Sequence, residues 1–202
     1  HFQAYLHHGY YPFFLEKRNF SENLLKTMNM MIEVDILLIY QMEQKNLNRI
    51  KKLLYLLATR GTGTPNVSQL AQEVLTSRTT IANYIKFLSD ARLINILYRK
   101  GEDYPKKPGR IMMNNTNLMY AMTPGNVNTE DLMDTFFQNA IWGKHKIRIG
   151  DRGCTFLLDN QYRFRLQNEA PKRKSTDVIY VRSDKNIGDE QVIPLWMFGL
   201  LY

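Results

Sequence analysis

The sequence has few of the residues and motifs on which metal, redox or nucleotide chemistry depends. Cys154 is the only cysteine among 202 residues, which excludes an intramolecular disulfide framework and a zinc site built from several cysteines. The phosphate-binding spacings G-x-x-x-x-G-K-[ST] and G-x-G-x-x-G do not occur. We therefore expect no cofactor in this chain, and no hydrolysis of a nucleotide by this chain alone.

Long apolar runs are also missing. No stretch reaches the roughly 18–20 residues of a membrane-spanning helix, and Asp35 interrupts the longest candidate, residues 34–40. The chain begins at His1 without the basic and apolar segments of a secretory signal peptide. Together with the single cysteine, this predicts a cytoplasmic protein with no membrane partner. Because no initiator methionine is present, we also expect a piece of a longer chain.

Positive charge is in excess. The chain has 27 Lys and Arg against 19 Asp and Glu, a formal net charge of +8. Its isoelectric point is near 9.5. Phosphate backbones attract lysine and arginine, so this excess favours a nucleic-acid partner. A solvated surface with a few extra lysines is the alternative explanation.

The segment 46–115 has the pattern of a helix, a short helix, a tight turn, a third helix and a hairpin. Apolar residues at helical and strand spacing predict its elements, which are helices over 48–60, 67–75 and 78–91 and strands over 93–98 and 110–114. This is the order of a winged helix-turn-helix. In such units the second helix of the pair enters the major groove of DNA.

Eight residues are candidates for contacts with double-stranded DNA. On the predicted recognition helix, an arginine contacts guanine or phosphate, an asparagine reads adenine, and threonines contact phosphate or a thymine methyl. Basic residues of the hairpin loop would lie along the phosphate backbone. The candidates are Arg78, Thr79, Thr80, Asn83, Lys86, Lys106, Lys107 and Arg110. Alternatively, Ser77 caps the helix while its neighbours are merely solvated, and the hairpin is kept soluble by lysine and proline.

The rest of the chain has a helix followed by short strands. The spacing predicts a helix over 129–141, strands over 146–149, 155–158, 161–166 and 177–181, a basic loop at 172–174 and a docked apolar C-terminus. Asp159–Asn160 is a two-residue hairpin signal. Short polar residues at helix starts are N-cap candidates, namely Ser21, Asn48, Ser68 and Thr129.

A metal-dependent nuclease site would need an Asp on one strand of this hairpin and a Glu and a Lys on the next. At the corresponding places the sequence has Thr155, Arg165 and Gln167, and an arginine cannot ligate a cation. We expect Glu130 to lie on a remote helix. The adjacent His7 and His8 do not share a helix face, so no metal pair is expected there. The sequence therefore predicts neither a catalytic nor a metal-binding residue.

Three stretches together resemble one family of proteins. They are F-x-x-Y-L-H-H-G-Y-Y-P-F near the start, N-V-S-Q-L-A-Q-E-V-L-T-S-R-T-T-I-A-N-Y-I-K-F-L-S-D-A-R-L-I in the middle and I-P-L-W-M-F-G-L-L-Y at the end. These are similar to the C-terminal region of prokaryotic AAA-type ATPases that carry a domain of unknown function after the ATPase module. The resemblance implies a winged helix, then a small α/β domain similar to the PD-(D/E)xK nuclease fold. It also implies a P-loop ATPase before residue 1, where ATP and Mg²⁺ would bind.

The chain departs from this family in the nuclease-like part. Relatives resemble F-x-V-x-x-K-Y-x-F-E-V-G-G-K, with an acid just before the first phenylalanine. Here Thr155 takes the place of the acid, Arg165 that of the glutamate, and Gln167 and Asn168 those of the glycine pair. If the domain descends from a nuclease, the residues of that site are missing.

The sequence therefore predicts an α+β protein in three parts: an N-terminal helical segment (1–45), a winged-helix domain (46–122) and a small, inactive restriction-endonuclease-like α/β domain (123–202). We expect a non-catalytic region of an AAA-type ATPase that binds double-stranded DNA. Its other partner would be the ATPase module of the same chain, and the assembly is compatible with an oligomer. The alternative is a protein-interaction module that uses its winged helix and the apolar residues around Trp196 and Phe198. A metal-dependent nuclease is the third possibility.

Overall fold

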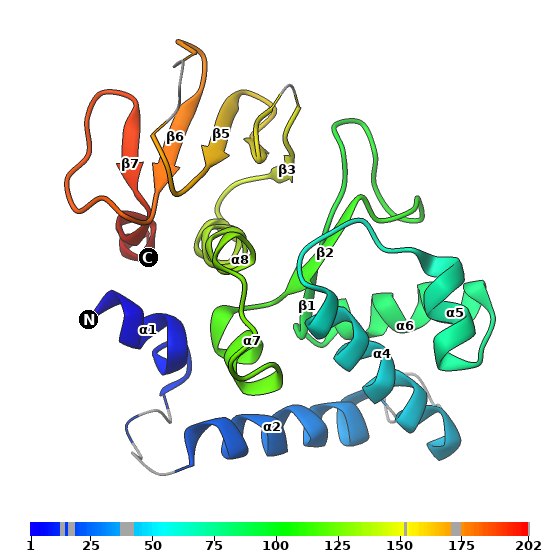
Figure 1. Ribbon diagram of the computed structural model, residues 1–202. Helices are drawn as coiled ribbons and strands as arrows, with labels where there is room; N and C mark the ends of the chain where they lie inside the picture. Colours follow the sequence, from blue (N-terminus) through cyan, green and yellow to red (C-terminus); the bar gives the residue numbers. More distant parts are fainter. Residues whose placement is uncertain (13–14, 16–18, 37–42, 152, 171–174, 202) are drawn as a thin grey trace. The chain divides into compact units, whose positions relative to one another are not determined.

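The computed structural model describes residues 1–12, 15, 19–36, 43–151, 153–170 and 175–201. The chain has an α+β fold, as predicted. It divides into two compact units (Figure 1): unit 1 comprises residues 1–96 and 111–127, and unit 2 comprises residues 97–110 and 128–202. The expected ranges 1–45 and 46–122 thus lie largely in one unit. The hairpin tip 97–110 is the exception.

Unit 1 is mostly helical. Its elements are α1 (Phe2–His8), α2 (Phe20–Met30), the π-helical turn η2 (Met31–Ile36), the 3-10 turn η3 (Gln44–Asn46), α4 (Leu47–Arg60), α5 (Val67–Val74), α6 (Arg78–Asp90) and α7 (Thr116–Met122). The helices predicted over 48–60, 67–75 and 78–91 are confirmed within two residues at each end. The first helix, α1, was not predicted. The predicted helical pattern beyond Ile36 falls on residues outside those described.

One hydrophobic core joins the helices of unit 1. Leu53 of α4, Leu70 of α5 and Ile81 of α6 are all at most 1% exposed, and α2 contributes Leu24. The apolar positions recur every three or four residues, so each helix has one apolar face to bury. This shared burial is the reason that residues 1–45 do not form a separate segment.

A buried polar run holds α1 against α7. The Thr116 hydroxyl donates to the Leu6 carbonyl at 2.7 Å, and the Asn117 side-chain amide donates to the same carbonyl at 2.8 Å. The Tyr10 backbone amide donates back to Asn117 Oδ1 at 2.9 Å. These bonds satisfy backbone groups at the end of α1 that the helix itself leaves unpaired.

The helix starts are set mainly by asparagines. Asn66 accepts from the Gln69 amide at 3.1 Å, Asn115 from Leu118 at 3.0 Å and Asn128 from Glu130 at 2.7 Å. Four predicted N-caps were wrong, because each lies inside its helix: Ser21, Asn48, Ser68 and Thr129. An asparagine one or two positions earlier precedes each of those four helices. Asn66 and Asn128 cap theirs with a side-chain hydrogen bond, whereas Asn19 and Asn46 do not.

A two-stranded sheet connects α6 to α7. It consists of β1 (Ile94–Leu97) and β2 (Arg110–Met113), close to the predicted strands. Gly63, in the link between α4 and α5, exchanges two backbone hydrogen bonds with Ile111, at 2.9 and 3.3 Å.

The hairpin tip belongs to unit 2 because it is bonded to strand β3 (Ile147–Ile149). The Ile149 amide donates to the Tyr98 carbonyl at 3.0 Å. Arg148, whose side chain is 6% exposed, donates to the Glu102 carbonyl at 2.6 Å and pairs with Asp103 at 2.7 Å.

Unit 2 is a five-stranded mixed sheet with α8 (Thr129–Ile141) and η4 (Leu195–Leu200). The other strands are β4 (Phe156–Leu158), β5 (Tyr162–Leu166), β6 (Ile179–Arg182) and β7 (Val192–Pro194), in the order β3-β4-β5-β6-β7. The pairs β3–β4 and β4–β5 are antiparallel, whereas β5–β6 and β6–β7 are parallel. Asp159 and Asn160 have φ angles of 52° and 59°, which the predicted hairpin turn requires. Strand β7 was not predicted.

Closely packed aromatic rings form the centre of unit 2. Phe137 of α8 is fully buried, with ring centroids 5.2 Å from those of Phe156 and Phe164 and 4.7 Å from that of Phe198. The burial of Phe198 docks η4, as the apolar C-terminus predicted. In Figure 1, η4 follows β7 directly along the chain. Among the described residues, no helix is long and apolar enough to cross a membrane.

Candidate functional site

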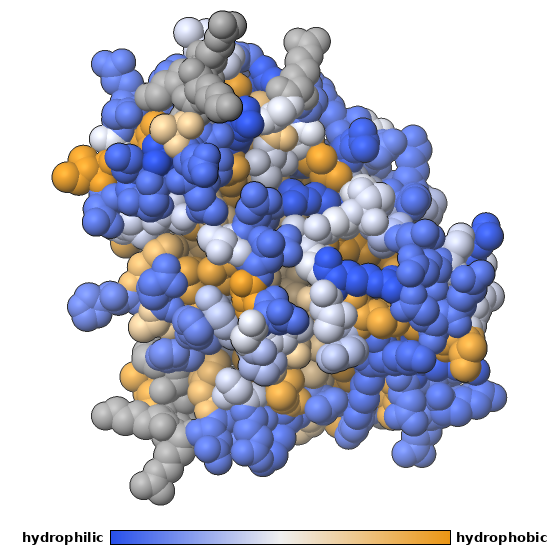
Figure 2. Space-filling view, viewed as in Figure 1, coloured by the Kyte–Doolittle hydropathy of each residue, from blue (hydrophilic) through white to orange (hydrophobic). Residues whose placement is uncertain are grey.

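The predicted recognition helix α6 presents three polar side chains to solvent. Its apolar residues, including Ile81 and Leu88, are buried in unit 1, so the opposite face is exposed. Arg78, Thr79 and Asn83 are exposed and make no side-chain hydrogen bond or ion pair with any described residue. The surface in the region of α5 and α6 is largely hydrophilic (Figure 2). These three residues are therefore available to a ligand.

Two other candidates on α6 are already engaged. Ser77 caps the helix by accepting from the Thr80 amide at 3.0 Å, and the two hydroxyls lie 2.8 Å apart. Lys86 pairs with Asp90 at 2.5 Å, one helical turn away. The two candidates themselves, Thr80 and Lys86, are half-buried. A phosphate would have to compete with Asp90 for Lys86, and such exposed helix pairs are weak.

The hairpin candidates divide into two kinds. Lys106 and Lys107 are exposed and have no side-chain partner among the described residues. Arg110 lies at the start of β2, is one-fifth exposed and forms an ion pair with Asp134 of α8. Its guanidinium also sits 5.7 Å from the centroid of the Phe156 ring. The predicted basic loop at 172–174 lies outside the described residues.

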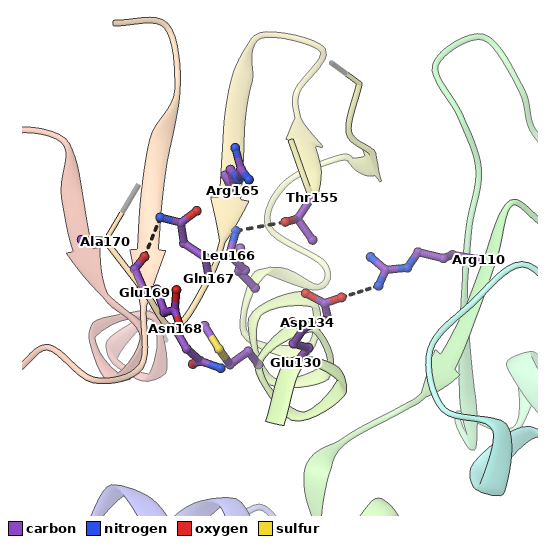
Figure 3. A pocket seen from close by; sticks show the side chains of 11 residues that line it. Arg110, Glu130, Asp134, Thr155, Arg165, Leu166, Gln167, Asn168, Glu169 and Ala170 are labelled. Carbon is purple, nitrogen blue, oxygen red and sulfur yellow. Dashed lines mark hydrogen bonds and ion pairs between the residues drawn. The ribbon is translucent and has the colours of Figure 1, made fainter. Parts of the chain in front are cut away.

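A second site is a polar cleft in unit 2 (Figure 3), which includes Thr155, Arg165 and Gln167, the positions that were compared with a nuclease site in the sequence. It has a volume of about 770 Å³, within the range of small-molecule sites. Glu130 and Asp134 project from α8, Thr155 directly precedes β4, and Arg165 lies on the adjoining strand β5. Residues 167–170 also line the cleft. The expectation that Glu130 is remote from the strand positions was wrong, because α8 packs against β5.

The buried pair of Arg110 and Asp134 is the strongest electrostatic feature of the cleft. The Asp134 side chain is 9% exposed. Burial raises the pKa of its carboxyl from 3.8 to about 6, although Arg110 opposes the shift. The negative charges of Asp131 and Glu130 add to the rise. A carboxyl with this pKa exchanges a proton close to neutral pH.

The strand residues of the cleft offer mainly hydrogen-bond donors. Thr155 Oγ1 accepts from the Leu166 amide at 3.0 Å, so its hydroxyl proton remains for another partner. Asn168 accepts the Ser183 hydroxyl at 2.5 Å on Oδ1, which leaves its NH₂ group. Arg165 is exposed and has no partner among the described residues.

One pattern in the sequence could have revealed the cleft. Glu130 and Asp134 are four residues apart, so they share a helix face. The pairing of Asp134 with Arg110 spans 24 residues and has no local signature.

The remaining candidates for metal or nucleophilic chemistry are the histidines and Cys154. His7 stacks on Tyr120 with ring centroids 3.6 Å apart, and His145 lies 2.7 Å from Asp159. Cys154 is partly buried, and burial raises the pKa of its thiol, so it is a poor nucleophile. Across the described part of the chain, no three His, Cys, Asp or Glu side chains are grouped as metal ligands.

Comparison with known proteins identifies a family but no characterised relative. No curated protein and no solved structure matches this chain. Residues 1–126 match the family described as Domain of unknown function (DUF8612). The match covers all of the residues of unit 1 except Val127, together with the hairpin tip. The chain therefore belongs to the DUF8612 family.

Proposed function

We propose that unit 1 binds double-stranded DNA through the exposed face of α6, as a winged helix-turn-helix. The observation that carries this proposal is a set of exposed polar side chains on that face that have no partner among the described residues: Arg78, Thr79 and Asn83. The order α4, α5, α6, β1, β2 is that of a winged helix, and the net charge of +8 favours a phosphate backbone. Lys106 and Lys107 belong to unit 2 and are separate candidates for sequence-independent phosphate contacts.

Duplex binding by the full chain tests this proposal. Fluorescence anisotropy with a labelled duplex should give an affinity that falls steeply as salt is raised from 50 to 200 mM, on the scale of the counterions released. Arg78→Ala should weaken binding about tenfold or more. Lys26→Ala, which removes an exposed charge on α2, serves as the matched control and should have little effect. The absence of duplex binding at low salt, or equal losses in both variants, would refute the proposal.

Asn83 separates recognition of bases from general attraction to phosphate. Asn83→Ala leaves the charge unchanged, so a loss of affinity for one duplex sequence but not for others would indicate a base contact. A uniform loss of affinity across sequences would place Asn83 against the backbone instead.

We propose that unit 2 is a restriction-endonuclease-like domain without nuclease activity. The resemblance puts Thr155, Arg165 and Gln167 where a nuclease would carry metal ligands, and all three line the cleft. A guanidinium repels a cation. Supercoiled plasmid should remain intact with Mg²⁺ or Mn²⁺. Nicking that is lost in Glu130→Gln would overturn this proposal.

That this chain is part of an AAA-type protein with an ATPase module stays a prediction. A Walker motif encoded upstream of His1 would test it.

The second candidate function is assembly with a protein partner. On η4, the side chains of Trp196, Met197 and Leu200 are 37%, 42% and 64% exposed. Apolar side chains grouped on one short helix are typical of an interaction surface. Sedimentation of Met197→Ser/Leu200→Ser should then show a smaller particle than the unmodified chain. Unchanged sedimentation would argue against self-assembly through η4.

A further inference from the structure

We propose that the polar cleft of unit 2 binds a phosphate group, with Arg165 as its principal anchor. This site lies entirely within unit 2, and the proposal does not depend on DNA binding by α6. The ligand is a phosphate ester, either of a small phosphorylated molecule or of a nucleic-acid strand.

The first argument is that Arg165 differs from the other arginines of the sheet. Arg148, Arg163 and Arg182 each pair with a carboxylate, namely Asp103, Asp177 and Asp184 respectively. Arg165 has no partner among the described residues, although its neighbour two positions earlier on β5 is paired. Arg165 is one of the residues that line the cleft, and Figure 3 shows its side chain on β5. An unpaired guanidinium in a cleft can form the two parallel hydrogen bonds that a phosphate accepts.

The second argument is the supply of donors beside Arg165. The Thr155 hydroxyl and the Asn168 NH₂ group both keep a proton for a ligand, because their oxygen atoms already accept within the protein. The Gln167 amide nitrogen, in contrast, donates to the Glu169 carbonyl at 2.7 Å. A site with a free cation and two neutral donors suits an acceptor-rich anion.

Pairing and solvation reduce the repulsion between the acidic side chains of the cleft and a bound anion. Asp134 is compensated by Arg110, and its charge is not open to the ligand. Glu130 and Glu169 are exposed, so water can solvate their carboxylates. Among the described residues of the cleft, Arg165 is the positive group left without a carboxylate partner, and it stands against the solvated negative charges of Glu130 and Glu169.

The cleft also links binding to pH. The charged groups around Asp134 are Arg110 of β2, Glu130 and Asp131 of α8 and Arg165 of β5. Below pH 6 Asp134 becomes neutral, which leaves the positive charge of Arg110 uncompensated. A phosphodiester keeps its charge over this range, so its binding should strengthen from pH 7.5 to pH 5.5. Asp134→Asn should abolish this dependence.

The test uses the full chain with two probes, inorganic phosphate and a single-stranded oligonucleotide without terminal phosphates. Amide and guanidinium NMR signals of Thr155 and Arg165 should shift during at least one titration. Arg165→Gln should weaken that binding about tenfold or more, as expected for loss of a charged hydrogen bond. Arg165→Lys should restore part of it. Lys185→Gln is the matched control, because it removes an exposed charge elsewhere in unit 2.

The outcomes distinguish the two sources of phosphate and the two proposals. A response to inorganic phosphate indicates a small phosphorylated ligand, and a response to the oligonucleotide alone indicates a strand. Arg78→Ala should leave the shifts at Thr155 and Arg165 unchanged, even if it abolishes duplex binding. No shift with either probe, or equal weakening by Arg165→Gln and Lys185→Gln, would overturn the phosphate site.

Discussion

Replacing Asp134 by asparagine should stabilise unit 2 at neutral pH but not at acidic pH. Asparagine has nearly the shape of the protonated carboxyl and can still accept a hydrogen bond from Arg110. The substitution therefore removes the ionisation of a buried group with little change in packing. Its effect should depend on pH, because the charged form of Asp134 is the one that burial disfavours.

The magnitude follows from the shift in pKa. The pKa of Asp134 is about 6 in the folded chain against an ordinary value of 3.8. Because the folded state holds this proton more tightly than the unfolded state, stability from this group rises as pH falls from 6 to 4. A difference of about two pKa units corresponds to about 3 kcal/mol. The advantage of Asp134→Asn should thus grow by about 3 kcal/mol between pH 4 and pH 7.5.

Urea unfolding followed by tryptophan fluorescence is a suitable assay, because Trp142 and Trp196 are the chain's two tryptophans and both lie in unit 2. The free energy of unfolding of both proteins would be measured at each pH. Subtracting one from the other cancels the titration of exposed carboxylates such as Asp103, whose pKa is lowered by Arg148. A difference that stays constant from pH 4 to pH 7.5 would refute the raised pKa of Asp134.

Three further substitutions test the packing, each by its change in the free energy of urea unfolding. Gly150→Ala would place a Cβ 2.5 Å from the Cys154 carbonyl oxygen and should cost about 1–3 kcal/mol, whereas Gly63→Ala meets no atom within 4 Å and serves as its control. Phe137→Ala should cost about 3–5 kcal/mol, and a cost below 1 kcal/mol would contradict the aromatic centre. Asn128→Ala should cost about 1 kcal/mol; a larger loss for Thr129→Ala would show that the cap is misassigned.

Much of the local structure could be predicted because its causes lie within a few residues of one another. The apolar spacing in α4, α5 and α6 predicts both the helices and the faces that they bury. The prediction failed where two short polar residues compete as caps, since Asn66 and Ser68 have similar capping strength and spacing alone does not choose between them. It also failed for α1, whose end is held by Thr116 and Asn117, more than 100 residues away.

The candidate residues on α6 also differ in how far the sequence could predict their environment. The outward face of α6 follows from the periodicity of its apolar residues, so Arg78, Thr79 and Asn83 could be chosen from the sequence. The sequence did not show that Thr80 is held by Ser77.

By itself, the sequence determined the positions of most helices and strands, the turn at Asp159 and the excess of positive charge. Hydrophobic periodicity and turn chemistry act over a few residues and leave a pattern that can be read along the chain. The tertiary structure alone decided that Arg110 meets Asp134, that Arg165 has no carboxylate partner among the described residues, and that both arginines line one cleft. Those outcomes depend on which distant side chains share a water-poor environment, because desolvation and charge pairing are set by position in space.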